Sequence, residues 1–270
     1  MKVIALDLDG TLLDKKKKIS APNQKRLLEL RKQGVKIVLA SGRSASAMRL
    51  YYNQLGLDEP IVCCNGALVM EPKNGNILAS HAIEKDDLDR AVAILEGEKA
   101  YYLAYTDLTL WLPSVKFTMK KWIERNRKLA PEDQVDIQIR PDFKNLFQEE
   151  LIYKLLIFCA DEKEKKRRFE KLRQLKGLEV IDSMPGAIDV MHHDVTKADG
   201  LKVIADYYGI TMEEIIFMGD HNNDVEALKQ AGVGVAMGNA TDAARKAADW
   251  QTADHEEDGV KLALDRLFAF

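Results

Sequence analysis

Two acidic side chains follow the first apolar segment of the chain. Asp7 and Asp9 end the run that begins at Val3, and Gly10 and Thr11 come directly after them. Side chains two apart on an extended segment lie on the same side. Paired carboxylates there can attack an electrophile, transfer a proton or bind a divalent cation. Acids after a strand often only cap the next turn, but two of them before Gly-Thr favour chemistry.

Two further polar segments also follow apolar runs. Ser41-Gly42-Arg43 comes directly after Val35–Ala40, and a hydroxyl and glycine amides that lead into a helix can bind an anion. Lys197 begins an expected helix that follows the apolar run Ala187–Met191. Either segment alone is a weak signal, because Ser-Gly is an ordinary loop and a lone lysine is usually only solvated.

A fourth segment, Gly219-Asp220-His221-Asn222-Asn223-Asp224, ends the apolar run Ile215–Gly219. It carries too many acids and amides for a simple turn. Ligands of open α/β sheets bind just beyond the carboxyl ends of the strands. The four segments therefore predict a single site, on which the following residues converge: Asp7, Asp9, Asp220, Asp224 and Lys197.

The elements that must position these residues alternate between strand-like and helix-like patterns. This alternation predicts an α/β fold with a parallel sheet. It stops after Asn65-Gly66, where Lys73-Asn74-Gly75 predicts a hairpin, and it returns at Ala187. Ser20 is the expected N-cap of the first helix, and Gly209 the expected end of the helix that Lys197 begins.

The length of 270 residues predicts two domains, at a soft prior of about 150 residues each. Because the alternation stops and later returns, we expect a discontinuous three-layer core of residues 1–82 and 186–270. A smaller α/β domain of residues 83–185 is then inserted between the two pieces. The strand Ala187–Met191 is assigned to the core.

The overall composition restricts the partners and the compartment. A net charge of −3 argues against nucleic acid or an anionic membrane as a partner, since both need a basic face. Three cysteines, Cys63, Cys64 and Cys159, fit a reducing compartment better than a disulfide framework. No apolar run approaches the about 18 residues of a membrane span. We expect a cytoplasmic protein.

Three other features have simple structural interpretations. The lysines and arginines of the expected helix Glu162–Leu175 are interpreted as a solvated face. The run Lys15–Lys18 is interpreted as solvated too, although it lies where it could draw anionic substrates inward. Neighbouring side chains of an extended segment point apart, so His192-His193-Asp194 is interpreted as a loop and not as a metal site.

In order and position, these motifs resemble those of the haloacid dehalogenase superfamily of phosphohydrolases, and within it the Cof-type sugar-phosphate and small-metabolite phosphatases. The resemblance spans essentially the whole chain and implies a Rossmann-like core with an inserted α/β cap of the C2 type. It rests on the motifs Asp7-Leu8-Asp9-Gly10-Thr11, Ser41-Gly42-Arg43, Asn65-Gly66-Ala67, Lys197, Gly219-Asp220-x-x-Asn223-Asp224 and Met237-Gly238-Asn239-Ala240.

The resemblance implies a role for each site residue. Asp7 is the expected nucleophile, which forms an aspartyl-phosphate, and Asp9 the expected general acid and then base. Mg²⁺ is the expected cofactor, bound by the carboxylates of Asp7 and Asp220 and by the backbone carbonyl of Asp9. The expected phosphate-binding groups are the backbone N–H of Leu8 together with Ser41, Gly42, Lys197 and Asn223.

Four residues keep open roles at this point. Asp224 would orient Lys197 or the surroundings of the metal. Asn65 would contact either the groups around the metal or the substrate. Arg43 would either reach a second anionic group or only hold its own loop in place. His221 would face water in preference to touching substrate.

The charges of the site can be counted. Four converging carboxylates against Lys197 and a divalent cation leave one net negative charge, so we expect Asp9 to be protonated when substrate is bound.

The predicted function is hydrolysis of phosphate monoesters of small metabolites. A phosphomutase on the same fold, which returns the phosphoryl group to its substrate, is one alternative, and a phospho-accepting signalling module is another. A catalytically silent binding protein is disfavoured, because every residue that the chemistry needs is present. The aromatic side chains Tyr105, Trp111 and Trp122 are as compatible with the core of the inserted domain as with substrate contact.

Overall fold

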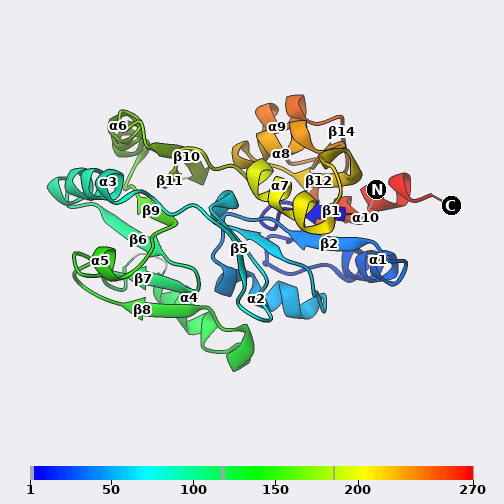
Figure 1. Ribbon diagram of the computed structural model, residues 1–270, viewed down its shortest axis with the longest axis horizontal. Helices are drawn as coiled ribbons and strands as arrows, with labels where there is room; N and C mark the ends of the chain where they lie inside the picture. The colour runs from blue at the N-terminus through cyan, green and yellow to red at the C-terminus, as the bar shows by residue number, and fades with distance from the viewer. Residues whose placement is uncertain (1–2, 117–118, 185, 270) are drawn as a thin grey trace. The chain divides into compact units, whose positions relative to one another are not determined.

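The computed structural model describes residues 3–116, 119–184 and 186–269. It divides into two compact units, each described here by itself (Figure 1). The first unit comprises the described residues up to Gly42, then Tyr51–Ala79, and then Thr196 onward. The second comprises Arg43–Leu50 and Ser80–Val195.

The first unit is built on a five-stranded parallel sheet in the order β14-β13-β12-β1-β2. Its strands are β1 (Val3–Leu6), β2 (Lys36–Leu39), β12 (Ile215–Gly219), β13 (Val233–Ala236) and β14 (Trp250–Gln251). Its helices are α1 (Ala21–Lys32), α7 (Lys197–Tyr208), α8 (Val225–Gln230), α9 (Asp242–Ala247) and α10 (Gly259–Leu267), while α2 (Ala45–Gln54) contributes to both units. The expected α/β class is confirmed.

Both faces of the parallel sheet are covered, which is why its central strands β1 and β12 are apolar and completely buried. Val3, Ala5 and Val38 pack in one cluster with residues of α7, α8 and α9. Figure 1 shows these three helices on one side of the sheet and α1, which contacts α10, on the other. As expected, the Ser20 side chain accepts a hydrogen bond from the Asn23 N–H at the start of α1.

A small antiparallel sheet follows in the order β3-β4-β5, with strands β3 (Ile61–Cys63), β4 (Leu68–Met70) and β5 (Ile77–Ser80). The expected hairpin is present between β4 and β5. Gly75 occupies its turn with a φ of 72°, and the Glu71 N–H donates to the Asn76 carbonyl. Short 3-10 segments complete the described chain at Cys64–Gly66, Pro131–Asp133, Met212–Glu214, Asn222–Asp224 and His255–Glu257.

The second unit is built on a six-stranded sheet in the order β10-β11-β9-β6-β7-β8. Its strands are β6 (Tyr101–Tyr105), β7 (Thr109–Leu112), β8 (Asp136–Ile139), β9 (Lys154–Phe158), β10 (Leu178–Met184) and β11 (Ala187–His192). Its helices are α3 (Lys85–Gly97), α4 (Met119–Asn126), α5 (Leu146–Glu149) and α6 (Glu162–Leu172). The sequence pattern predicts a helix over 117–129, and its first two residues, 117 and 118, lie outside the described residues.

The three aromatic candidates of this unit, two on strands and one on a helix, are partly buried and pack against its core. Trp111 packs against the cluster on one face of the sheet, and Tyr105 and Trp122 pack against the cluster on the other.

The placement of the strand Ala187–Met191 in the core was wrong. It forms β11, which pairs antiparallel with β9 and β10 inside the six-stranded sheet. An apolar strand that precedes a helix has the same pattern in either sheet, and only its pairing partners distinguish the two. The chain therefore re-enters the first unit at Thr196, ten residues later than residue 186.

The interpretation of α6 as a solvated face was wrong for two of its basic residues. Arg168 and Lys165 are buried, and each pairs with an acid from elsewhere in the second unit. The Arg168 Nε lies 3.1 Å from Glu98, and the Lys165 Nζ lies 2.6 Å from Asp182. Three basic side chains on Glu98 lower the pKa of that carboxyl to about 2, the hydrogen bond from Lys171 being the largest cause.

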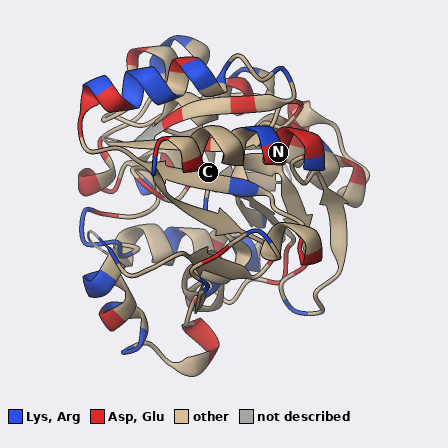
Figure 2. Ribbon diagram, turned by 90° about the vertical axis from the view of Figure 1, so that its left-hand side faces the viewer, with Lys and Arg blue, Asp and Glu red and all other residues tan. Residues whose placement is uncertain are grey.

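Figure 2 shows both positive and negative residues on many of the ribbons. Among residues 3–116, 119–184 and 186–269, no helix combines the length and the apolar character that crossing a bilayer requires.

Candidate active site

The predicted site residues of the first unit converge where its parallel strands end. Leu6 pairs with Met218 on one side and with Leu39 on the other, so the residues after these positions become neighbours. The Asp7 N–H donates to the Met218 carbonyl at 3.0 Å, and the Ala40 N–H donates to the Leu6 carbonyl at 2.9 Å. The strand register thus brings the Asp7, Ser41 and Asp220 segments together.

Lys197 is the central cation of this group. Its side chain is fully buried, and its Nζ donates to Asp7 Oδ1 and to Asp224 Oδ1, both at 2.6 Å. Burial alone would lower the pKa of Lys197, but the charges of Asp224 and Asp7 outweigh it and raise the pKa instead. This lysine is therefore a permanent positive charge that links two carboxylates from distant parts of the chain.

The start of α7 fixes the position of Lys197. Thr196 caps the helix, and its side chain and that of Asp199 form a reciprocal capping box. Gly66 lies against this cap with a φ of 107°, and a Cβ there would come within 2.1 Å of the Thr196 carbonyl oxygen. A cation at the positive end of a helix dipole is unfavourable without acidic partners, so its position here indicates a specific role.

The acids around Lys197 outnumber the cations that contact them. Burial, with repulsion from Asp224 opposing the attraction of Lys197, raises the pKa of Asp7 to about 7. Burial and the charges of Asp7 and Asp224 raise the pKa of Asp220 to about 8. The three carboxylates offer oxygens within 4.8 Å of one another. The group therefore carries more negative charge than Lys197 balances.

Asp220 is held by two polar residues to which the sequence analysis gave no role. The Thr11 hydroxyl donates to its Oδ1 at 3.2 Å, and the Asn239 amide donates to its Oδ2 at 3.1 Å. Asn239 also donates to the Gly10 carbonyl at 2.8 Å. The position of Asn239, just after the strand-like run that ends at Met237, was the signal that could have identified it.

Position 10 must be a glycine because the Asp220 carboxylate packs against it. It has a φ of 86°, and a Cβ on it would lie 2.3 Å from Asp220 Oδ2. Any side chain at this position would both strain the backbone and displace the carboxylate.

Asp224 serves to position its neighbours. Its Oδ1 accepts from Lys197, and its Oδ2 accepts from the backbone N–H groups of Asp220 and His221, both at 2.9 Å. Its side chain is fully buried. Both oxygens are therefore engaged, and of the two open roles the geometry favours the orientation of Lys197.

The residues present fit a divalent metal ion. Two buried carboxylates with raised pKa values, Asp7 and Asp220, are hard oxygen ligands of the type that Mg²⁺ prefers. A divalent cation beside them would offset the surplus negative charge and favour their ionised forms.

Asp9 lies in a more exposed environment than Asp7. Its side chain is 39% exposed, and Lys17 Nζ donates to its Oδ1 at 2.7 Å. Lys17 lies in a tight turn with a φ of 58°, and its carbonyl accepts a hydrogen bond from the Tyr51 hydroxyl at 3.1 Å. The interpretation of Lys15–Lys18 as a solvated run is therefore incomplete, because Lys17 pairs with the expected general acid. The count of site charges also omitted this lysine.

The remaining phosphate-site candidates of the first unit form a second hydrogen-bonded group. The Asn223 amide donates to Asn65 Oδ1 at 2.8 Å, and the Asn65 N–H donates to the Ser41 carbonyl at 3.0 Å. A Cβ on Gly42 would lie 2.8 Å from the same Asn65 oxygen. Asn65 has a φ of 58°, and Cys64 before it has a φ of 48°, so a left-handed turn delivers this side chain.

Three candidates remain. The Leu8 side chain is completely buried, which anchors the backbone between Asp7 and Asp9. Arg43 falls in the second unit, where its guanidinium donates to the Ala47 carbonyl at 3.4 Å and so contacts its own helix. His221 contributes its backbone N–H to Asp224.

The chain was compared with known proteins. The haloacid dehalogenase-like hydrolase family model matches residues 4–264. The chain belongs to this family. It is 32% identical to the 5-amino-6-(5-phospho-D-ribitylamino)uracil phosphatase YitU of Bacillus subtilis, over 99% of this chain and 97% of that protein.

Two further relatives cover nearly the whole chain. The pyridoxal phosphate phosphatase YbhA of Escherichia coli is 26% identical, over 96% of each chain. A crystal structure of a haloacid dehalogenase-like hydrolase from Bacteroides thetaiotaomicron is 29% identical, with a TM-score of 0.84 over 99% of each chain. The resemblance seen in the motifs is confirmed, and so is the expectation of a phosphoric monoester hydrolase.

Proposed function

We propose that this hydrolase removes phosphate from small phosphorylated metabolites through an aspartyl-phosphate on Asp7, with Mg²⁺ as its cofactor. The observation that carries the proposal is the fully buried Lys197, which contacts Asp7 and Asp224 at 2.6 Å each. A fixed cation beside a nucleophilic carboxylate would stabilise the negative charge that the transferring phosphoryl group brings.

In the first step, an Asp7 carboxylate oxygen attacks phosphorus. The new bond joins Asp7 to phosphorus, while the bond from phosphorus to the leaving oxygen breaks. Asp9 donates its proton to that oxygen, so the leaving group departs as an alcohol. Before this step Asp9 must release Lys17, whose ammonium stabilises the carboxylate form.

In the second step, water attacks the phosphorus of the aspartyl-phosphate. The Asp9 carboxylate accepts a proton from this water, and the bond between Asp7 and phosphorus breaks. Inorganic phosphate leaves, and both aspartates return to their starting states. The balance of protons needs no other acid or base.

The remaining side chains of the first unit bind and orient. The Ser41 hydroxyl, the Gly42 and Leu8 amides, Lys197 and Asn223 would hold phosphate oxygens, and Asn65 would orient Asn223 through their 2.8 Å hydrogen bond. The carboxylates of Asp7 and Asp220 and the Asp9 carbonyl would hold Mg²⁺. The ion would neutralise charge as the anionic substrate approaches the anionic nucleophile.

The two units would have different roles in the reaction. Every residue named in these steps lies in the first unit. No residue has been assigned to binding the leaving alcohol. We infer that the second unit acts as a cap that selects this leaving group, as the domain order in the sequence predicts. A cytoplasmic location also remains a proposal.

The test is phosphate release from a panel of phosphorylated sugars, nucleotides and cofactors. The panel includes 5-amino-6-(5-phospho-D-ribitylamino)uracil and pyridoxal phosphate, because relatives are named for them. We expect release that requires Mg²⁺ and disappears in Asp7→Asn. Unchanged activity of Asp7→Asn or Asp9→Asn would contradict the assigned roles.

Product analysis separates the alternatives. A mutase would return the phosphoryl group to its substrate, and a signalling module would become phosphorylated without sustained turnover. Good activity on a phosphoprotein and poor activity on the whole panel would contradict the small-molecule substrate.

A further inference from the structure

Three of the five histidines of the chain lie on the two segments that connect the units. The longer stretch of the second unit begins at Ser80 and ends at Val195. His81 lies on the entering segment, and His192 and His193 lie on the leaving one. The phosphatase mechanism proposed above uses none of them.

The expectation that His192 and His193 point apart was wrong. β11 ends at His192, and a turn follows, so the strict alternation of a strand does not continue. The two ring centroids lie only 4.7 Å apart, with an interplanar angle of 34°. Asp194 joins them, because its Oδ2 lies 3.1 Å from His193 Nε2 and its N–H donates to His192 Nδ1 at 3.2 Å.

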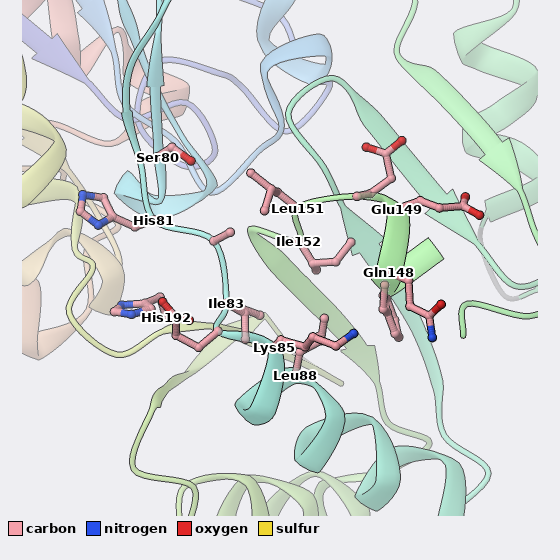
Figure 3. Close-up of a pocket in the computed structure, with 14 residues that line it drawn as sticks. Ser80, His81, Ile83, Lys85, Leu88, Gln148, Glu149, Leu151, Ile152 and His192 are labelled. Atoms are coloured by element: carbon pink, nitrogen blue, oxygen red, sulfur yellow. The ribbon is translucent and has the colours of Figure 1, made fainter. Parts of the chain in front are cut away.

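His81 approaches this group from the other connecting segment. The ring centroids of His81 and His192 lie 6.4 Å apart. Figure 3 shows both rings at one end of a cavity of about 550 Å³, which the two connecting segments help to line. The rings extend toward the same side of the backbone in this view.

These separations match those of ligands around one transition-metal ion. Zinc binds imidazole nitrogen at about 2.0–2.1 Å, so neighbouring donor atoms lie about 3.0–3.4 Å apart. At a tetrahedral angle the same bond length places the centroids of two imidazole ligands about 5.2–5.4 Å apart, and the observed separations of 4.7 Å and 6.4 Å lie on either side of this distance. The donor atoms of His192, His193 and Asp194 lie within 4.8 Å of one another, and His81 would have to rotate toward them to become the fourth ligand.

The composition of the group selects the ion. Imidazole nitrogens with one carboxylate suit zinc and its neighbours, whereas Mg²⁺ demands oxygen ligands. His193 and Asp194 have side chains that are 44% and 74% exposed, so an ion can enter from solvent. We propose that His81, His192, His193 and Asp194 form a binding site for a Zn²⁺-type divalent ion, which joins the two connecting segments.

This proposal does not rest on the proposed catalytic function. The site shares no residue with the Asp7, Asp220 and Asp224 group, and its ligands all lie in the second unit. Its structural consequence is a cross-link between segments that are more than a hundred residues apart in the sequence.

The test is calorimetric titration of the full chain with Zn²⁺ in saturating Mg²⁺. Asp220→Asn is the starting protein, so that Zn²⁺ binding at the acidic group is weakened. We expect one Zn²⁺ per chain, and affinity at least about tenfold lower in His193→Ala and in His81→Ala made in this background. Equal affinity in either variant would overturn the proposal.

His221→Asn is the matched control, because this histidine lies beside the acidic group and outside the proposed site. It should keep the full Zn²⁺ affinity, and a loss there would place the ion at the acidic group instead. Co²⁺ gives a second readout, since nitrogen ligation in a four-coordinate site produces visible absorption that His193→Ala should remove. Phosphate release by His193→Ala without Zn²⁺ is measured separately and should equal that of the wild type, so failure here and failure of the catalytic proposal are distinguishable.

Discussion

Each unit of the protein buries a lysine beside an aspartate, but the two lysines have different surroundings. Lys154 on β9 lies 3.2 Å from Asp189 on the neighbouring strand β11, with the Tyr105 ring centroid 4.4 Å away. Lys197 contacts two carboxylates, and a third, Asp220, lies beside them. In the first pair the charges match, whereas the surplus carboxylates around Lys197 leave negative charge that a metal cation would balance.

The largest expected effect comes from Lys197→Met. Asp7 and Asp224 would stay buried without their cation, and breaking a buried pair in this way costs about 3–5 kcal/mol. We expect kcat for phosphate release to fall on the order of a hundredfold to a thousandfold as well. Denaturant unfolding and phosphate release check the two effects.

Lys202→Met is the control for this substitution, because Lys202 is an exposed lysine on the same helix. It should change the free energy of unfolding by no more than about 0.5 kcal/mol. Wild-type activity in Lys197→Met would contradict the comparison of the two lysines.

The Lys154–Asp189 pair should respond differently. Lys154→Met alone should cost about 3–5 kcal/mol, but the double variant Lys154→Met/Asp189→Leu should recover much of this loss, because no unpaired charge remains. Unfolding measurements on the four proteins of this cycle give the coupling energy. The folded variants should keep the wild-type kcat, and a lost kcat would show that this pair acts on the substrate.

The surplus negative charge of the acidic group also predicts how the stabilisation by Mg²⁺ depends on pH. The pKa values of Asp7 and Asp220 in the folded protein, about 7 and about 8, exceed the ordinary value of about 3.9. At pH values between about 3.9 and about 8, the folded state binds more protons than the unfolded state. The stability of the ion-free protein therefore falls as the pH rises through this range. Mg²⁺ binding needs the ionised carboxylates, so the increase in Tm on adding Mg²⁺ should grow over the same range.

Thermal unfolding with and without Mg²⁺ at a series of pH values measures this increase. Asp220→Asn should show a much smaller dependence on pH. A Tm increase that is equal at low and high pH would contradict the surplus-charge description.

The smallest effect is expected for Lys17→Met. The Lys17–Asp9 pair is exposed, and such pairs contribute at most about 1 kcal/mol, so Tm should hardly change. A cation at this position also attracts an anionic substrate, so KM should rise about tenfold and kcat/KM should depend less on salt, while kcat should not fall, because Asp9 no longer has to release Lys17. Lys16→Met, a change at a neighbouring lysine, is the control for the kinetics, and an equal rise in KM there would assign the effect to general charge.

The sequence predicted that the site residues of the first unit converge, because three of the four motifs directly follow an apolar run. Position after a strand is a local property, and parallel pairing then brings Asp7, Ser41 and Asp220 together. Lys197 could be placed at a helix start, which is also a local property, although the strand before it belongs to the other sheet. The capping role of Thr196 is local as well.

Contacts between distant residues could not be predicted in this way. The alternation of β11 with a following helix looks like a core unit, and only its pairing with β9 places it elsewhere. Arg168 looks solvent-exposed on its helix until Glu98 is brought against it. The pairing of Lys17 with Asp9 depends on a turn whose left-handed residue is a lysine, which no residue preference indicates.

The capping box at Thr196 has an evolutionary consequence. The second unit ends at Val195, and the next two residues begin α7 and supply the buried lysine. Because Thr196 and Asp199 start this helix by themselves, the inserted segment can be lengthened, shortened or exchanged while Lys197 keeps its place. Under the proposed role of the second unit as a cap, descendants of one ancestral enzyme would acquire new specificities by changing the insertion alone and would inherit the proposed catalytic residues unchanged.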